Sequence, residues 1–89
     1  MRRAGVELSV VVPVYNEERR LPGSLVGLGL ALREVAAEVI VVDNGSTDRT
    51  VDVVRDQRFP VTLLHCPDRG KGAAVRAGVL AAQGRYVGF

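Results

Sequence analysis

The sequence predicts an α/β fold with a mostly parallel sheet, because strands and helices alternate along the chain. Four short apolar segments, rich in β-branched residues, are predicted to be strands: residues 8–14, 39–42, 61–64 and 85–89. Three segments with helical patterns lie between them, as crossovers between parallel strands require. The expected order is β-α-β-α-β-α-β, a Rossmann-like arrangement that binds ligands at the carboxyl ends of its strands.

The first two helices are predicted from apolar spacing and from the residues at their ends. Leucines recur every three or four residues across 21–32, the period of an amphipathic helix, and Pro22 suits its first turn. A short second helix is expected over residues 49–55, with Thr47 or Asp48 as its N-cap.

Composition narrows the class of protein. A net charge of +2, with the basic residues scattered, argues against a nucleic-acid partner. The single cysteine, Cys66, excludes an intrachain disulfide and suggests a reducing compartment. No stretch approaches the roughly 18 apolar residues of a membrane span. We therefore expect a cytoplasmic location, and any membrane association would depend on further segments, at the cytoplasmic face.

Polar residues follow the first predicted strand. Pro13, Tyr15, Asn16 and Glu17 put an aromatic ring and hydrogen-bonding groups at the carboxyl edge of the sheet. They suit stacking on a base or ribose. The alternative is a plain turn, with Asn16 as a helix N-cap.

Acidic residues follow the second predicted strand. Asp43 comes directly after buried residues, where a carboxylate is costly unless it is paired or lies at the rim. It could accept hydrogen bonds from a nucleobase N–H or a ribose hydroxyl, or act only within the turn. Asp48 is expected to be a structural cap.

A glycine-rich loop, residues 69–72 (RGKG), follows the third predicted strand. Glycines let a ligand approach the backbone, and the helix predicted next, to about residue 82, favours anions at its N-terminus. Gly84 is expected to end that helix. Lys71 adds a positive charge, so the loop suits a diphosphate, although a merely flexible loop is the alternative. It is neither a Walker A loop nor a dinucleotide fingerprint.

Histidine and cysteine often act in catalysis, but the sequence does not support a catalytic role for His65 or Cys66. His65 follows a strand and has no acidic or nucleophilic partner visible in the sequence, so a structural role is expected. Cys66 is expected to be inert. No metal-ligand spacing is present, and no catalytic residue is assigned.

Taken together, the three loops resemble the N-terminal region of the family 2 glycosyltransferases, inverting enzymes with the GT-A fold. The resemblance runs over residues 8–89 and rests on three segments: VVPVYNEERRLP, VIVVDNGSTDRT and RGKGAAVRAGVLAAQGRYVGF. The residues of these segments are most similar to those of the branch that uses polyprenyl phosphates, dolichyl-phosphate β-glucosyltransferases in particular. The resemblance implies an N-terminal tail at residues 1–7 and an incomplete nucleotide-sugar-binding half-domain at 8–89, truncated at the fourth strand.

The resemblance also implies roles for individual residues. The nucleotide-sugar-binding set is Pro13, Tyr15, Glu17, Asp43, Gly70, Lys71 and Arg76. Within this set, Asp43 matches the position that hydrogen-bonds the base. Asp48 matches a second, structural acid of the same motif. Gly70 and Lys71 match the loop near the sugar nucleotide.

The resemblance implies a divalent ion, Mg²⁺ or Mn²⁺, that the chain itself does not hold. In the family, the strand matched by residues 85–89 leads to an Asp-x-Asp motif for that ion, and the catalytic base follows later. The full enzyme would move a hexose from a UDP- or GDP-sugar to an acceptor such as a polyprenyl phosphate, and this chain alone would be inactive. The alternatives are a non-catalytic nucleotide-binding module and, less well supported, a nucleotidyltransferase.

Overall fold

The computed structural model describes residues 5–89, so the predicted tail, residues 1–7, is described only from residue 5. The predicted alternation of strands and helices is confirmed. The elements in chain order are β1 (Leu8–Val14), α1 (Leu21–Leu32), β2 (Ala37–Asp43), α2 (Thr50–Arg55), β3 (Thr62–His65), α3 (Lys71–Ala81) and β4 (Tyr86–Gly88).

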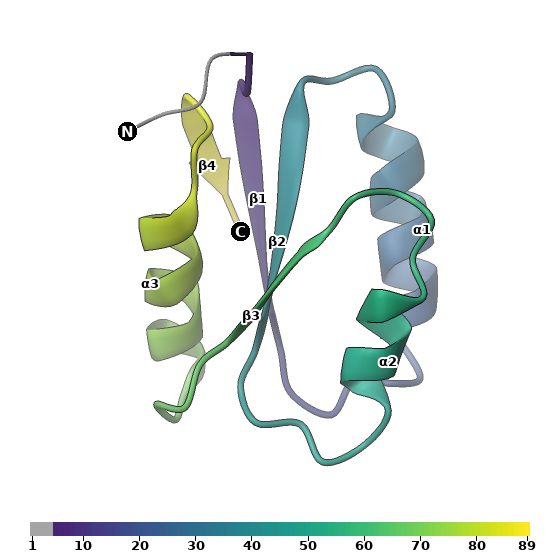
Figure 1. The fold of residues 1–89 in the computed structure, drawn as a ribbon, viewed down its shortest axis with the longest axis vertical. Helices are drawn as coiled ribbons and strands as arrows, with labels where there is room; N and C mark the ends of the chain where they lie inside the picture. Colours follow the sequence, from purple (N-terminus) through teal and green to yellow (C-terminus); the bar gives the residue numbers. More distant parts are fainter. Residues whose placement is uncertain (1–4) are drawn as a thin grey trace.

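The four strands form one parallel sheet in the order β3-β2-β1-β4. The pairing of β1 with β2 runs from Leu8 beside Ala37 to Val14 beside Asp43, so both strands end at the same edge of the sheet. Helices α1 and α2 lie on one face of the sheet and α3 lies on the other (Figure 1). The molecule is therefore a three-layer α/β structure whose strand-to-helix loops gather at the carboxyl edge.

The core follows from the pleat of β2, whose successive side chains point to opposite faces. Val39 and Val41 pack with Leu25 and Val54 under α1 and α2. The alternate residues of β2 pack on the other face, under α3, with Val11 and Ala74. Because both faces are covered by helices, the central residues of the strand, 39–42, are all apolar, as the sequence predicts.

Gly84 has a tertiary role besides following α3. The helix ends with its C-cap at Ala82, and the N–H of Gly84 donates to the hydroxyl of Ser9 at 2.8 Å. A Cβ at Gly84 would lie 2.6 Å from the Ser9 nitrogen. Ser9 in turn donates to Glu38, so the close approach joins the start of β4 to β1 and β2.

Two cap assignments are wrong. The N-cap of α1 is Arg20, and Asn16 lies before the helix in a left-handed conformation with φ of 49°. The N-cap of α2 is Arg49, and neither Thr47 nor Asp48, the two residues predicted, occupies that position. The Asp48 side chain nevertheless accepts a hydrogen bond from the N–H of Thr50 at 2.9 Å, which explains why its sequence position resembles a cap.

Candidate functional site

A cleft of about 670 Å³ opens at the carboxyl edge of the sheet. Its walls come from the loops after β1 and β2 and from the start of α3. The lining residues are Pro13, Val14, Tyr15, Glu17, Asn44, Gly45, Thr47, Pro67, Arg69, Gly70, Lys71 and Ala74. The volume lies within the range of small-molecule sites, about 300–1,000 Å³. Five of the seven predicted binding residues therefore lie around one cleft: Pro13, Tyr15, Glu17, Gly70 and Lys71.

The loop after β1 is tied to the loop after β2 by hydrogen bonds at Asn16. Its N–H donates to the hydroxyl of Ser46 at 3.0 Å, and its side-chain oxygen accepts from the N–H of Thr47 at 2.8 Å. The N–H of Glu17 donates to the Thr50 hydroxyl at 2.8 Å. These bonds hold the loop while Tyr15 stays 56% exposed at the cleft, where its ring is free to stack on a planar ligand.

Asp43 does not line the cleft. It continues the alternation of β2, in which Val41 points to the face covered by α1 and α2, so its carboxylate lies on the face opposite α3. The side chain is buried, accepts weak hydrogen bonds from the N–H of Ser46 at 3.3 and 3.4 Å, and lies 3.6 Å from His65 Nδ1. Its backbone stays beside Val14, which brings it close to the Tyr15 loop in the sheet.

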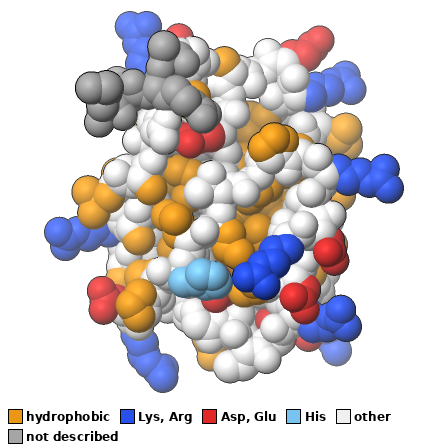
Figure 2. All heavy atoms as spheres, in the orientation of Figure 1, with side chains coloured by type: hydrophobic (Ala, Val, Ile, Leu, Met, Phe, Trp, Pro, Cys, Tyr) orange, Lys and Arg blue, Asp and Glu red, His pale blue; other side chains and the backbone are white. Residues whose placement is uncertain are grey.

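His65, the chain's one histidine, therefore has an acidic partner that the sequence does not indicate. Its side chain is 60% exposed and is the pale-blue group at the surface in Figure 2. Most Lys and Arg side chains lie around the perimeter of the same view and one lies beside the histidine, without a basic patch on that face. Register explains the pair, because Asp43 and His65 are the last residues of neighbouring strands.

The start of α3 forms the opposite wall of the cleft. Gly70 is the N-cap, with φ of 104°, a backbone conformation that favours glycine. Lys71 is the first residue of the helix, Arg69 precedes the cap, and the first turn carries no acidic residue. Positive side chains at a helix N-terminus make this wall suited to an anion.

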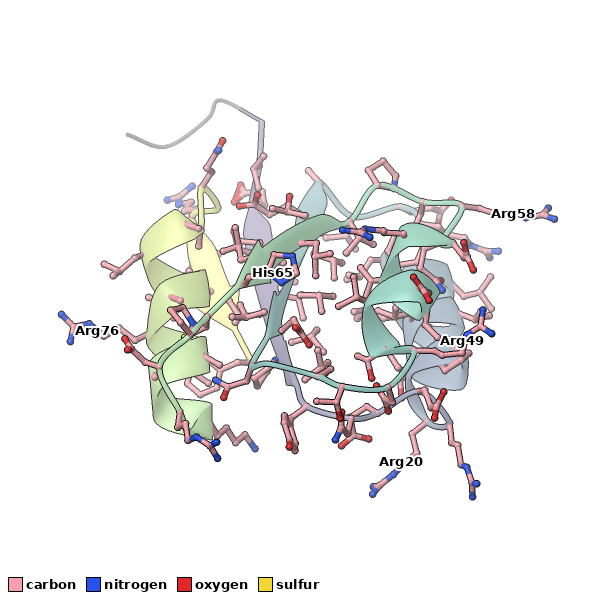
Figure 3. All side chains as sticks on the ribbon, turned by 60° about the horizontal axis from the view of Figure 1, so that its bottom comes forward. Arg20, Arg49, Arg58, His65 and Arg76 are labelled. Carbon is pink, nitrogen blue, oxygen red and sulfur yellow. The ribbon has the colours of Figure 1, made fainter. Side chains whose placement is uncertain are left out.

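Arg76 lies apart from this wall. Ala74 and Gly78 are the residues of α3 buried against the sheet, and Arg76, midway between them in sequence, falls on the opposite side of the helix. Figure 3 shows its side chain pointing outward from α3, away from His65 and the sheet. The structure therefore does not bring Arg76 to the cleft.

Asp48 fixes the turn between β2 and α2. Its Oδ1 accepts from the N–H and, at 2.5 Å, from the hydroxyl of Thr50, and its Oδ2 accepts from the N–H of Glu18. Burial raises the pKa of the carboxyl group, but these hydrogen bonds outweigh it and hold the pKa of Asp48 below its ordinary value of 3.8. The structural role predicted for Asp48 has a physical basis in these contacts.

The side chain of Asn44 is a second feature that the sequence does not indicate. It lines the cleft and donates hydrogen bonds to two carbonyl groups in the loop before α3, those of Asp68 and Gly70. The one signal in the sequence is that Asn44 lies in a turn-forming segment, and this does not indicate which groups its side chain bonds.

Within residues 5–89, no three acidic, histidine or cysteine side chains come together as a metal site. None of the helices in that range has the length and apolar character needed to cross a membrane.

Comparison with known proteins decides the family. The family model for "Glycosyl transferase family 2" matches residues 9–89. The chain belongs to this glycosyltransferase family. Among curated relatives, the dolichyl-phosphate beta-glucosyltransferase of Drosophila melanogaster is 43% identical over 97 residues, covering 94% of this chain and 30% of that protein. The family 2 chain thus spans less than a third of the length of this relative.

Solved structures with the GT-A fold have the same architecture. TarS of S. aureus superposes with a TM-score of 0.77 at 29% identity, over 92% of this family 2 chain and 26% of that one. Glucosyl-3-phosphoglycerate synthase from Mycobacterium tuberculosis, solved with Mn²⁺, UDP and glucosyl-3-phosphoglycerate, gives a TM-score of 0.72 at 30% identity, over 91% and 31% of the two chains. The predicted GT-A half-domain is confirmed.

Proposed function

We propose that this chain binds the nucleotide-sugar donor in an inverting glycosyltransferase that transfers glucose from UDP-glucose to a polyprenyl phosphate such as dolichyl phosphate. One observation carries the proposal: a cleft with an exposed tyrosine on one wall and a basic helix start on the other lies at the carboxyl edge of the sheet. The identity to a dolichyl-phosphate beta-glucosyltransferase supports the choice of sugar and acceptor.

The uridine half of the donor is proposed to lie against the loop after β1. The exposed Tyr15 ring offers a stacking surface, while Pro13 and Glu17 flank it. Asp43 does not line the cleft but lies beside the cleft-lining Val14 in the sheet, and it is proposed to accept a hydrogen bond from the part of the base that extends past the cleft. Its carboxylate has acceptor positions left beyond those used by the Ser46 N–H, since two oxygens offer about four lone pairs.

The diphosphate half is proposed to lie at the start of α3. Lys71 and Arg69 supply charge, and Gly70 allows a phosphate to approach the backbone. Arg76 is left out of this proposal because its side chain points away from the cleft.

The catalytic steps are assigned to parts of the enzyme other than residues 5–89. Inverting transfer requires a base on the acceptor oxygen and stabilisation of the departing diphosphate, which a divalent ion such as Mg²⁺ or Mn²⁺ would supply. The presence of Mn²⁺ beside UDP in the solved neighbour supports a divalent ion in this role. The described residues hold no cluster that fits such an ion, so no metal step is assigned to them. We expect no glycosyl transfer from this chain alone.

The acceptor suggests where the enzyme works. A polyprenyl phosphate resides in a bilayer, so the complete enzyme is proposed to act at the cytoplasmic face of a membrane. The described helices would not provide a membrane span there.

Calorimetric titration of the chain with UDP-glucose, UDP and GDP tests the proposal. UDP and UDP-glucose should bind more tightly than GDP, because the solved neighbour with this architecture binds UDP and the curated relative transfers glucose. Tighter binding of GDP would contradict the choice of donor. Binding of none of the three would contradict the donor-binding function itself.

A further inference from the structure

The side-chain amide of Asn44 joins two loops of the cleft. Its Nδ2 donates to the carbonyl oxygen of Asp68 at 3.0 Å and to that of Gly70 at 3.2 Å. Asn44 directly follows β2, whereas both acceptors lie 24 and 26 positions later, just before α3. Because both partners are carbonyl groups, the amide must present its nitrogen to them, and both hydrogens are used.

The start of α3 has no cap of its own. Gly70 has no side chain with which to bond the first N–H groups of the helix, and the cap position makes no side-chain hydrogen bond. Its carbonyl accepts the N–H of Ala74 at 3.3 Å in addition to Asn44, which occupies both lone pairs of the oxygen. Asn44 therefore holds the beginning of the helix from the neighbouring loop.

Because the peptide unit is planar, hydrogen bonds that fix a carbonyl group also fix the direction of the N–H group of the next residue. In a trans peptide the C=O and the following N–H point in opposite directions within one plane. Fixing the Gly70 carbonyl fixes the N–H of Lys71, and fixing the Asp68 carbonyl fixes the N–H of Arg69. Both N–H groups belong to residues that line the cleft.

We propose that Asn44 is a positioning residue for the diphosphate of the donor, acting through the orientation of the loop at residues 68–71. The inference rests on the proposed function. It adds that Asn44 affects binding of the diphosphate at the start of α3 and not binding of the uridine at the loop after β1. Without the two hydrogen bonds the loop would be ordered only when a ligand binds, and the cost of that ordering would lower affinity.

Titration of Asn44→Leu with UDP and with uridine separates this role from others. Leucine has nearly the shape of asparagine and removes both donors. UDP affinity is expected to fall about 5- to 10-fold, the effect of losing one or two hydrogen bonds, while uridine affinity stays within about twofold. Backbone amides of residues 69–72 should become more mobile by NMR relaxation in the ligand-free variant. Asn44→Ala provides a second variant should leucine impair folding.

A matched control exists just after α2, which ends at Arg55. Gln57 also donates from a side-chain amide to a backbone carbonyl, that of Val53 at 3.0 Å, and lies outside the cleft. Gln57→Leu should leave the affinities for UDP and uridine unchanged. An equal fall for both ligands in Asn44→Leu, an unchanged UDP affinity, or an undisturbed loop at residues 69–72 would overturn the positioning role. Failure of the unmodified chain to bind UDP would instead overturn the proposed function, and the inference with it.

Discussion

The carboxylate of Asp43 and the imidazole of His65 face each other across the ends of two neighbouring parallel strands, with Oδ2 and Nδ1 3.6 Å apart. Asp43 is buried and His65 is exposed, so the histidine is the outer member of the pair. It can limit the orientations of the carboxylate that is proposed to recognise the base.

His65→Ala is expected to weaken uridine and UDP binding by the same factor, about 2- to 5-fold, because the loss of a polar neighbour affects base recognition and not binding of the diphosphate at the start of α3. Calorimetric titration with each ligand measures the two factors. Thr62→Ala, an exposed position at the start of β3, provides the control and should change neither affinity. A loss confined to UDP would contradict the assignment of this pair to the base.

Asp48→Asn should lower the melting temperature at neutral pH, because the pKa of Asp48 is lower in the folded chain than its ordinary value of 3.8. A depressed carboxyl pKa stabilises the fold above the unfolded-state pKa, and this contribution is lost as the pH falls through the folded-state pKa. The difference in melting temperature between the two proteins should therefore shrink below about pH 4.

A thermal melt series against pH checks this expectation. Asp56→Asn, an exposed position at the other end of α2, serves as the control and should show a smaller difference at neutral pH. A difference for Asp48→Asn that is constant down to acidic pH would show that the charge of the carboxylate is not what stabilises the turn.

Gly78→Ala is expected to destabilise the chain by about 1–3 kcal/mol, since overpacking a well-filled contact costs that much. Gly78 faces the sheet, where an added Cβ would overlap the side chain of Val11. Gly27→Ala, in α1 with open space around it, should instead stabilise the chain by about 0.5–1 kcal/mol. Urea denaturation of both variants measures the free energies of unfolding. Equal effects would contradict the close packing of α3 on β1.

UDP binding by this chain is expected to be weak and to change by less than about twofold on addition of Mg²⁺, since residues 5–89 offer no carboxylate cluster to share the ion with the diphosphate. Titration with UDP in the presence of Mg²⁺ or of a chelator makes the comparison. A large gain in affinity with the metal would reveal a metal site within this chain.

Local patterns in the sequence are enough to predict most of the fold. β1 is predicted at its observed limits because β-branched residues fill both of its faces, and α1 because leucines recur at helical spacing and Pro22 suits its first turn. The exact caps are less predictable. Asp48 resembles an N-cap in sequence, yet its side chain bonds the helix from one residue further out.

The sequence predicts which loops form the candidate site, but not how side chains from different loops and strands pair with one another. Tyr15 and Lys71 reach the same cleft because parallel strands share a carboxyl edge. The direction of the Asp43 side chain depends on the phase of the pleat at the last residue of β2, and its pairing with His65 depends on register. The Asn44 bonds join residues more than twenty positions apart, which no local pattern encodes.

The central claim is that the cleft at the carboxyl edge binds the nucleotide. NMR titration of the ¹⁵N-labelled chain with UDP tests it most directly. The largest amide shifts are expected at Tyr15, at residues 43–47 and at residues 69–72, with little change at β4 or along the outer side of α3 around Arg76. Shifts concentrated away from these loops, or no shifts at saturating UDP, would contradict the claim.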